Sequence, residues 1–175
     1  MSFDDAVVLL DAALRSPDHP GEESAMFRAE LEGEIARSRR VPGVKMARDA
    51  LAFADGRSGS PLESRSRIIM WRHGLPRPVL QHVVVDDHGH VIARLDFAWL
   101  EEKVYGECDG AVKYDELLAP GQTARQVLMA EKHRDNALAD RGWRQVRWMG
   151  PDLARPKVLC GRIQQALAGS RRPAA

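Results

Sequence analysis

The chain has 175 residues, of which 44% are hydrophobic and 29% are charged, and its formal net charge at pH 7 is +1. This length supports one globular core with a small additional part, and the balanced charge gives no preference for nucleic acid by itself. The only cysteines, Cys108 and Cys160, exclude a disulfide framework and lack the paired spacing of a structural zinc site.

The N-terminal segment MSFDDAVVLL is acidic where a secretory signal is basic, and no run of about 18 apolar residues predicts a membrane helix. We therefore expect a cytoplasmic protein with no membrane association. Charge is distributed unevenly: residues 1–60 have 8 basic and 11 acidic side chains, and residues 61–175 have 18 and 14. The net charge is therefore −3 for residues 1–60 and +4 for residues 61–175, so a polyanion would prefer the second part.

The first sixty residues are expected to be helical. Apolar residues recur at helical spacing over 3–14, 22–40 and 44–54, and proline and glycine separate these stretches. Residues 1–57 are therefore an N-terminal helical region without concentrated chemistry. Several arginines here and in the next helix either contact phosphates or, more commonly, solvate helices: Arg37, Arg39, Arg40, Arg65, Arg67 and Arg72.

A strong helix start follows at Ser60-Pro61-Leu62-Glu63, where Ser60 is the expected N-cap, Pro61 takes the first helical position and Glu63 completes a capping box. Gly74 ends this helix. Glu63 lies at the border of its buried side, so both a capping role and a role in a functional site are open.

Three strands are then predicted over 79–85, 91–99 and 103–109, followed by a helix over 123–141, a strand over 143–148 and a helix over 157–167. This order predicts an α+β fold with a mixed central sheet. Residues 58–168 are the expected domain, and residues 169–175 are a flexible tail.

Acidic side chains are crowded on two of these strands. Glu107 and Asp109 share a face because successive strand residues alternate. A tight turn centred on Glu101-Glu102 pairs positions that sum to 203, which places Asp96 opposite Glu107. An odd-length loop would destroy this pairing. The arrangement is either an exposed acidic sheet face or a site for Mg²⁺ or Mn²⁺, with Asp109 as a further ligand or an orienter of metal-bound water.

The segments SPLESR, ARLDFAW, VYGECDG with the following Lys113, EKHRDNALADRGW and QVRW together resemble the PD-(D/E)XK nuclease-like superfamily. The closest resemblance is to the branch similar to very-short-patch repair endonucleases, and it covers about residues 58–168. It implies a restriction-endonuclease-like core, with a sheet of about four strands flanked by helices. It also implies Mg²⁺- or Mn²⁺-dependent hydrolysis of DNA, with Glu63, Asp96, Glu107 and Asp109 holding the metal.

The sequence departs from the superfamily pattern at Asp109, which stands where Glu-X-Lys places its lysine. Either Lys113 or Lys132 would then stabilise the transition-state charge or position the attacking water, although exposure of Lys113 in a loop and of Lys132 on a helix face is the competing interpretation. The leading expectation is a metal-dependent endonuclease. The alternative is a catalytically impaired DNA-binding or interaction module, associated with a toxin–antitoxin or phage-defence system.

The N-terminal winged-helix segment of longer proteins of this type is expected to lie before the start of this chain, which argues against a complete transcriptional antitoxin. Three histidines around residues 86–90 have spacing that zinc or nickel could use, but an exposed turn explains them better: His82, His88 and His90.

Overall fold

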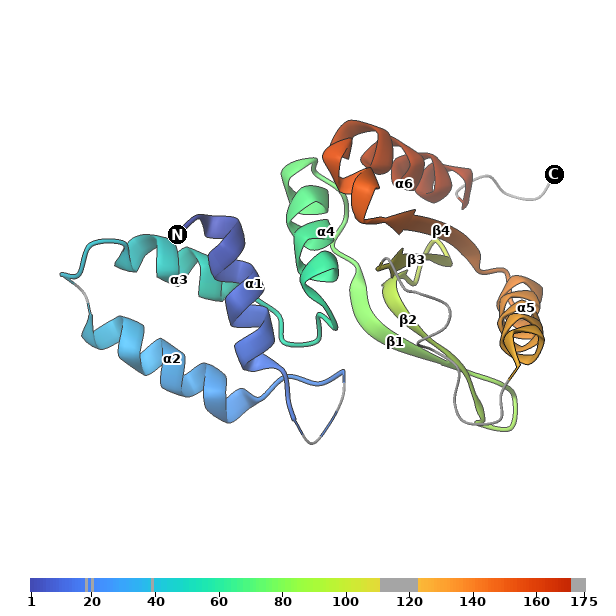
Figure 1. The fold of residues 1–175 in the computed structure, drawn as a ribbon, viewed down its shortest axis with the longest axis horizontal. Helices are drawn as coiled ribbons and strands as arrows, with labels where there is room; N and C mark the ends of the chain where they lie inside the picture. The colour runs from blue at the N-terminus through green and yellow to red at the C-terminus, as the bar shows by residue number, and fades with distance from the viewer. Residues whose placement is uncertain (18, 20, 39, 111–122, 171–175) are drawn as a thin grey trace. The chain divides into compact units, whose positions relative to one another are not determined.

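The computed structural model describes residues 1–17, 19, 21–38, 40–110 and 123–170 (Figure 1). It divides into an N-terminal unit, Met1–Ile69, and a C-terminal unit, Met70–Ala175. The expected α+β fold, with N-terminal helices before a mixed sheet of four strands, is confirmed. Within the described ranges, no helix is long and apolar enough to cross a membrane.

The N-terminal unit consists of α1 (Phe3–Leu14), α2 (Ala25–Arg37), α3 (Val44–Phe53) and the first part of α4 (Pro61–Arg72). Serine side chains cap α1 and α2 by accepting a hydrogen bond from the backbone N–H three residues later. The buried face of α1 packs against α3 and α4 through Val7, Ala50 and Ile68. These contacts form a helical core of the unit's own.

A buried ion pair lies within this core. Arg67 Nη1 is 2.8 Å from Asp11 Oδ2, and the two side chains are 5% and 1% exposed. Arg67 also donates to the Ser58 hydroxyl and the Phe53 carbonyl, while the Asp55 backbone N–H donates to the other carboxylate oxygen of Asp11. The interpretation of Arg67 as a solvated or phosphate-contacting side chain is therefore wrong, because its buried guanidinium is paired with Asp11 and hydrogen-bonded within the unit.

The C-terminal unit is built on β1 (Val79–Val85), β2 (Val91–Trp99), β3 (Val104–Asp109) and β4 (Arg144–Met149), in that spatial order. β2 pairs antiparallel with β1 and with β3, and β3 pairs parallel with β4. The helix α5 (Ala124–Asp140) precedes β4, and a 3-10 turn over Gly150–Ala154 leads into α6 (Pro156–Ser170). A capping box at Thr123 and Gln126 fixes the start of α5.

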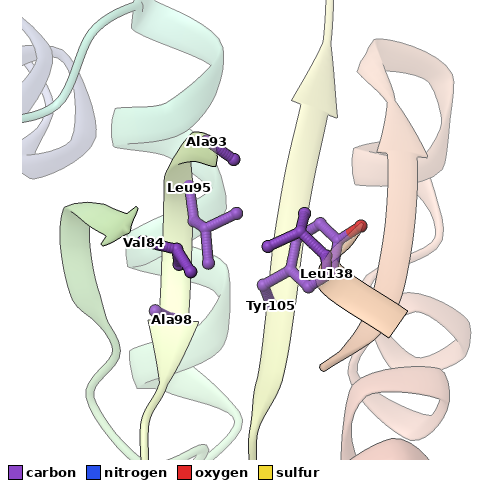
Figure 2. Close-up of a cluster of buried hydrophobic side chains, with 6 residues drawn as sticks. All are labelled: Val84, Ala93, Leu95, Ala98, Tyr105 and Leu138. Carbon is purple, nitrogen blue, oxygen red and sulfur yellow. The ribbon is translucent and has the colours of Figure 1, made fainter. Parts of the chain in front are cut away.

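The two faces of the sheet bury different side chains. On one of them Leu138 of α5 lies beside Tyr105 of β3 and joins a cluster from β1 and β2 (Figure 2). On the other face, Trp148 of β4 reaches across β3 to Phe97, with ring centroids 5.2 Å apart. Gly106 makes this contact feasible, because a Cβ at that position would lie 2.4 Å from the Trp148 ring.

Candidate functional site

The register of the β2–β3 hairpin follows the turn arithmetic as far as the ladder extends. The register pairs Phe97 with Gly106, Ala98 with Tyr105 and Trp99 with Val104, so each pair sums to 203. Asp96 and Glu107 are the next positions along the two strands. The predicted hairpin register is therefore confirmed up to the position immediately before these two acids.

Asp96 is half-buried and is held on both sides by neighbouring strands. Its Oδ2 accepts a hydrogen bond from the Cys108 backbone N–H of β3 at 3.2 Å, and Gln81 Nε2 of β1 lies 3.4 Å from its Oδ1. Gln81 has a φ of +52°, which is rare for a residue with a side chain. Between Leu80 and His82, which pair normally, this residue departs from the β1–β2 ladder beside Asp96. Backbone outliers of this kind concentrate at functional sites.

Glu107 is the most enclosed of the predicted site acids, with 6% of the residue exposed. Arg134 of α5 lies 3.0 Å from Oε1. The other oxygen, Oε2, accepts from Gln145 Nε2 at 2.7 Å and from Arg147 Nη2 at 2.8 Å, both on β4. Two guanidinium groups and an amide therefore satisfy this carboxylate within the protein.

Arg147 connects several acids at once. It is the register partner of Glu107 across the parallel β3–β4 pair. Its Nη2 is 2.8 Å from Glu131 of α5, and its Nε is 3.0 Å from Asp109 Oδ2. Burial lowers the pKa of Arg147, but hydrogen bonds to Glu107 and Glu131 outweigh this effect and raise it. The guanidinium therefore stays charged at every pH at which the protein is folded.

The same cluster affects its other members. Burial lowers the pKa of Arg134, but the charges of Glu107 and Asp135 outweigh burial and raise it. The pKa of Tyr105 is raised well above its ordinary value, first by burial and then by the nearby charge of Glu107. We call the group of Glu107, Asp109, Glu131, Arg134, Asp135 and Arg147 the arginine–carboxylate cluster.

The contacts of the described residues do not fit a magnesium or manganese centre at Glu107. A divalent ion needs carboxylate oxygens that are free to coordinate it. Both oxygens of Glu107 already contact guanidinium groups, and Asp109 is paired with Arg147. Among residues 1–110 and 123–170 that are described, no three His, Cys, Asp or Glu side chains converge as a metal site would require. Positive charge at this position comes from arginine.

The remaining predicted residues have separate environments. Glu63 is buried in the N-terminal unit and accepts hydrogen bonds from the Gly59 backbone N–H at 2.7 Å and the Ser60 hydroxyl at 2.9 Å, which confirms the capping role. Lys132 is exposed on α5. Lys113 lies outside the described residues.

The histidines favour the exposed-turn interpretation. His90 Nδ1 lies 3.1 Å from Asp86, and the side chain of His90 is 79% exposed. His82 instead lies against Trp143, with ring centroids 5.9 Å apart. The two histidines therefore have different partners and do not converge on one another.

Sequence reasoning missed the basic half of the cluster. Arg134, Gln145 and Arg147 all contact Glu107 from elements 27 to 40 residues away in the chain. The only sequence signal was that Gln145 and Arg147 share one face of a predicted strand. That signal shows that the two side chains lie on the same face of the strand, but it does not show which residues of the fold that face contacts.

Comparison with known proteins gives relatives without an assigned activity. No protein-family model matches the chain, and no solved structure matches it. Two proteins of Mycobacterium tuberculosis are each 35% identical to it over 167 residues: Uncharacterized protein MT2308 of strain CDC 1551 / Oshkosh and Uncharacterized protein Rv2248 of strain ATCC 25618 / H37Rv. The match covers 95% of this chain and 56% of each relative, so the chain spans about half the length of the curated relatives it matches.

Proposed function

We propose that the C-terminal unit is a DNA-binding domain of nuclease-like fold, in which arginines neutralise the acidic strand ends that a cleaving enzyme would use for metal. The observation that carries this proposal is the enclosure of Glu107 by Arg134, Gln145 and Arg147. DNA as the partner is inferred from the resemblance to the nuclease-like superfamily and from the positive balance of residues 61–175.

The energetics favour arginine over a divalent ion at this position. A cation bound to Glu107 would displace two guanidinium groups from a carboxylate that is almost fully enclosed. Separating one partner from a buried ion pair costs about 3–5 kcal/mol, and less where the partner reaches water. Metal binding would have to supply that free energy in addition to dehydrating the ion.

A second candidate is a metal-dependent endonuclease that hydrolyses DNA phosphodiester bonds. The register of β2 and β3 supports it, because Asp96 and Glu107 follow directly after the last pair of the ladder. In this alternative the two acids hold Mg²⁺ or Mn²⁺ after the arginines withdraw, and Asp109, Lys113 or Lys132 assists.

One experiment with two readouts separates the candidates. Fluorescence anisotropy with a labelled duplex measures binding, and supercoiled plasmid with Mg²⁺, Mn²⁺ or EDTA measures nicking. We expect duplex binding without metal-dependent nicking. Absence of duplex binding would overturn the DNA-binding proposal.

Matched variants make the nicking readout specific. Asp96→Asn removes a carboxylate that the endonuclease would need for its metal, whereas Asp140→Asn removes an exposed carboxylate at the end of α5. Metal-dependent nicking that is lost in Asp96→Asn and kept in Asp140→Asn would establish the endonuclease and refute the metal-free assignment.

A further inference from the structure

A basic groove runs between the edge strand β4 and α6 in the C-terminal unit. Its volume is about 480 Å³, and its polar lining consists of Arg144, Gln145 and Arg147 from β4 and Arg162 and Gln165 from α6. The other described lining residues are small or apolar, and none of the described lining residues is a carboxylate. Between β4 and α6, the guanidinium groups of Arg144 and Arg162 supply hydrogen-bond donors to an anion.

Neutral acceptors hold the arginines of this groove in place. Arg144 donates to the Ala166 carbonyl near the end of α6. The absence of a side chain at Gly169 leaves room for it, because a Cβ there would lie 2.8 Å from Arg144 Nη1. Arg162 donates to the Arg147 carbonyl on the strand. A carbonyl fixes a guanidinium without cancelling its charge, so each of these arginines keeps its charge and further N–H donors.

The groove and the arginine–carboxylate cluster lie on opposite faces of β4, because successive strand side chains alternate. The side chains of Gln145 and Arg147 donate to Glu107 on the face that α5 covers, whereas the backbone carbonyl of Arg147 accepts from Arg162 in the groove. The charge of Arg147 is balanced by its acids, whereas the acceptors of Arg144 are neutral and Asp152 lies 3.8 Å from Arg162 Nη1. The uncompensated charge is therefore concentrated at Arg144 and, less completely, at Arg162.

We infer that this groove binds the phosphodiester backbone of DNA through Arg144 and Arg162. The choice of DNA rests on the proposed function, whereas the position of the surface rests on the groove itself. Arginine forks match phosphate oxygens, and the part of the lining that the structure describes contains no aromatic side chain on which a base would stack. Binding is accordingly independent of sequence and sensitive to salt.

The test measures duplex affinity of the full chain by anisotropy between 50 and 200 mM salt. Each phosphate contact contributes about 0.9 to the slope of log K against log salt. R144Q/R162Q should lower that slope by about 2, so its loss of affinity should be roughly tenfold larger at 50 mM than at 200 mM. Glutamine still carries an N–H donor for the carbonyl, so this variant removes charge more than structure.

Two controls separate charge from packing. R144K/R162K keeps the charge and should keep most of the slope. R125Q/R155Q removes two exposed arginines outside the groove and should leave the slope nearly unchanged. Thermal denaturation of each variant checks that the unit is folded.

Duplex binding by the wild type with an unchanged slope in R144Q/R162Q would overturn the groove assignment and leave the proposed function standing. An equal fall in R125Q/R155Q would also overturn it. Calorimetry with inorganic phosphate tests whether the groove is instead a site for free phosphate. If R144Q/R162Q abolishes phosphate binding but leaves duplex binding intact, the inference is contradicted. A wild type that binds no duplex refutes both this inference and the proposed function.

Discussion

Glu107→Gln tests how strongly the arginine–carboxylate cluster stabilises the C-terminal unit. The substitution keeps the shape of the side chain and removes its charge. Breaking a fully buried pair costs about 3–5 kcal/mol. Here the side chains of Arg134 and Arg147 are 31% and 38% exposed, so water recovers part of their solvation when Glu107 is neutral. We expect a loss of about 2 kcal/mol, within the range for hydrogen bonds to a charged group.

Tryptophan fluorescence is a suitable assay, because all four tryptophans of the sequence lie in the C-terminal unit. Urea titration should show a lower midpoint with an unchanged slope. In a unit of about this size, 2 kcal/mol corresponds to a fall in Tm of roughly 8–16 °C.

Asp109→Asn is the matched control. Asp109 also pairs with Arg147, but its side chain is 45% exposed, so its removal should cost at most about 1 kcal/mol. Equal destabilisation by the two variants would refute the argument that burial makes Glu107 the stabilising partner. The result also bears on nuclease assays, because a Glu107 variant that loses activity must be shown to be folded at the assay temperature.

Two further predictions concern buried groups elsewhere in the chain. Asp11→Asn should destabilise the N-terminal unit by about 3–5 kcal/mol, because Arg67 loses its buried partner. The double variant Asp11→Leu/Arg67→Met should recover much of this loss, since neither charge is then buried alone. Urea titrations followed by far-UV circular dichroism measure both, and losses of stability that simply add in the double variant would contradict the prediction. Burial raises the pKa of Tyr105, so its contribution is complete below about pH 10, where the unfolded phenol is neutral, and declines as pH rises further. Tyr105→Phe should therefore flatten the alkaline fall of the urea midpoint above about pH 10, and an unchanged fall there would contradict this.

The hairpin that carries the predicted acids could be worked out from the sequence because its geometry is local. Antiparallel neighbours joined by a short turn have a register set by the number of turn residues. The four positions from Leu100 to Lys103 fix this number, and Lys103 closes the turn with a φ of +47°. The unfavourable composition of the turn did not shift the pairing, and Phe97, Val104 and Tyr105 are buried in the observed register.

The partners of these acids depend on non-local geometry and could not be predicted in the same way. A parallel pair has no short turn to set its register, and α5 must first cross to bring β4 beside β3. The side chains that reach Glu107 are therefore determined by how the helix and the strand pack. The Asp11–Arg67 pair, 56 residues apart, was missed for the same reason: nothing local distinguishes Arg67 from an exposed arginine.

In the proposed nuclease-like domain, Arg147 also accounts for Asp109 standing where a cleaving enzyme of that fold would have lysine. A lysine two residues after Glu107 would present its charge on the same strand face, beside that carboxylate. Arg147 presents a charge at this position from the neighbouring strand, with Nη2 at Glu107 and Nε at Asp109. Its pKa is raised, so it neutralises both acids but cannot donate or accept a proton as a lysine of lowered pKa can. In the proposed DNA-binding domain, an arginine in this role preserves the charge balance of the cluster and contacts the carboxylate oxygens that a divalent metal would need.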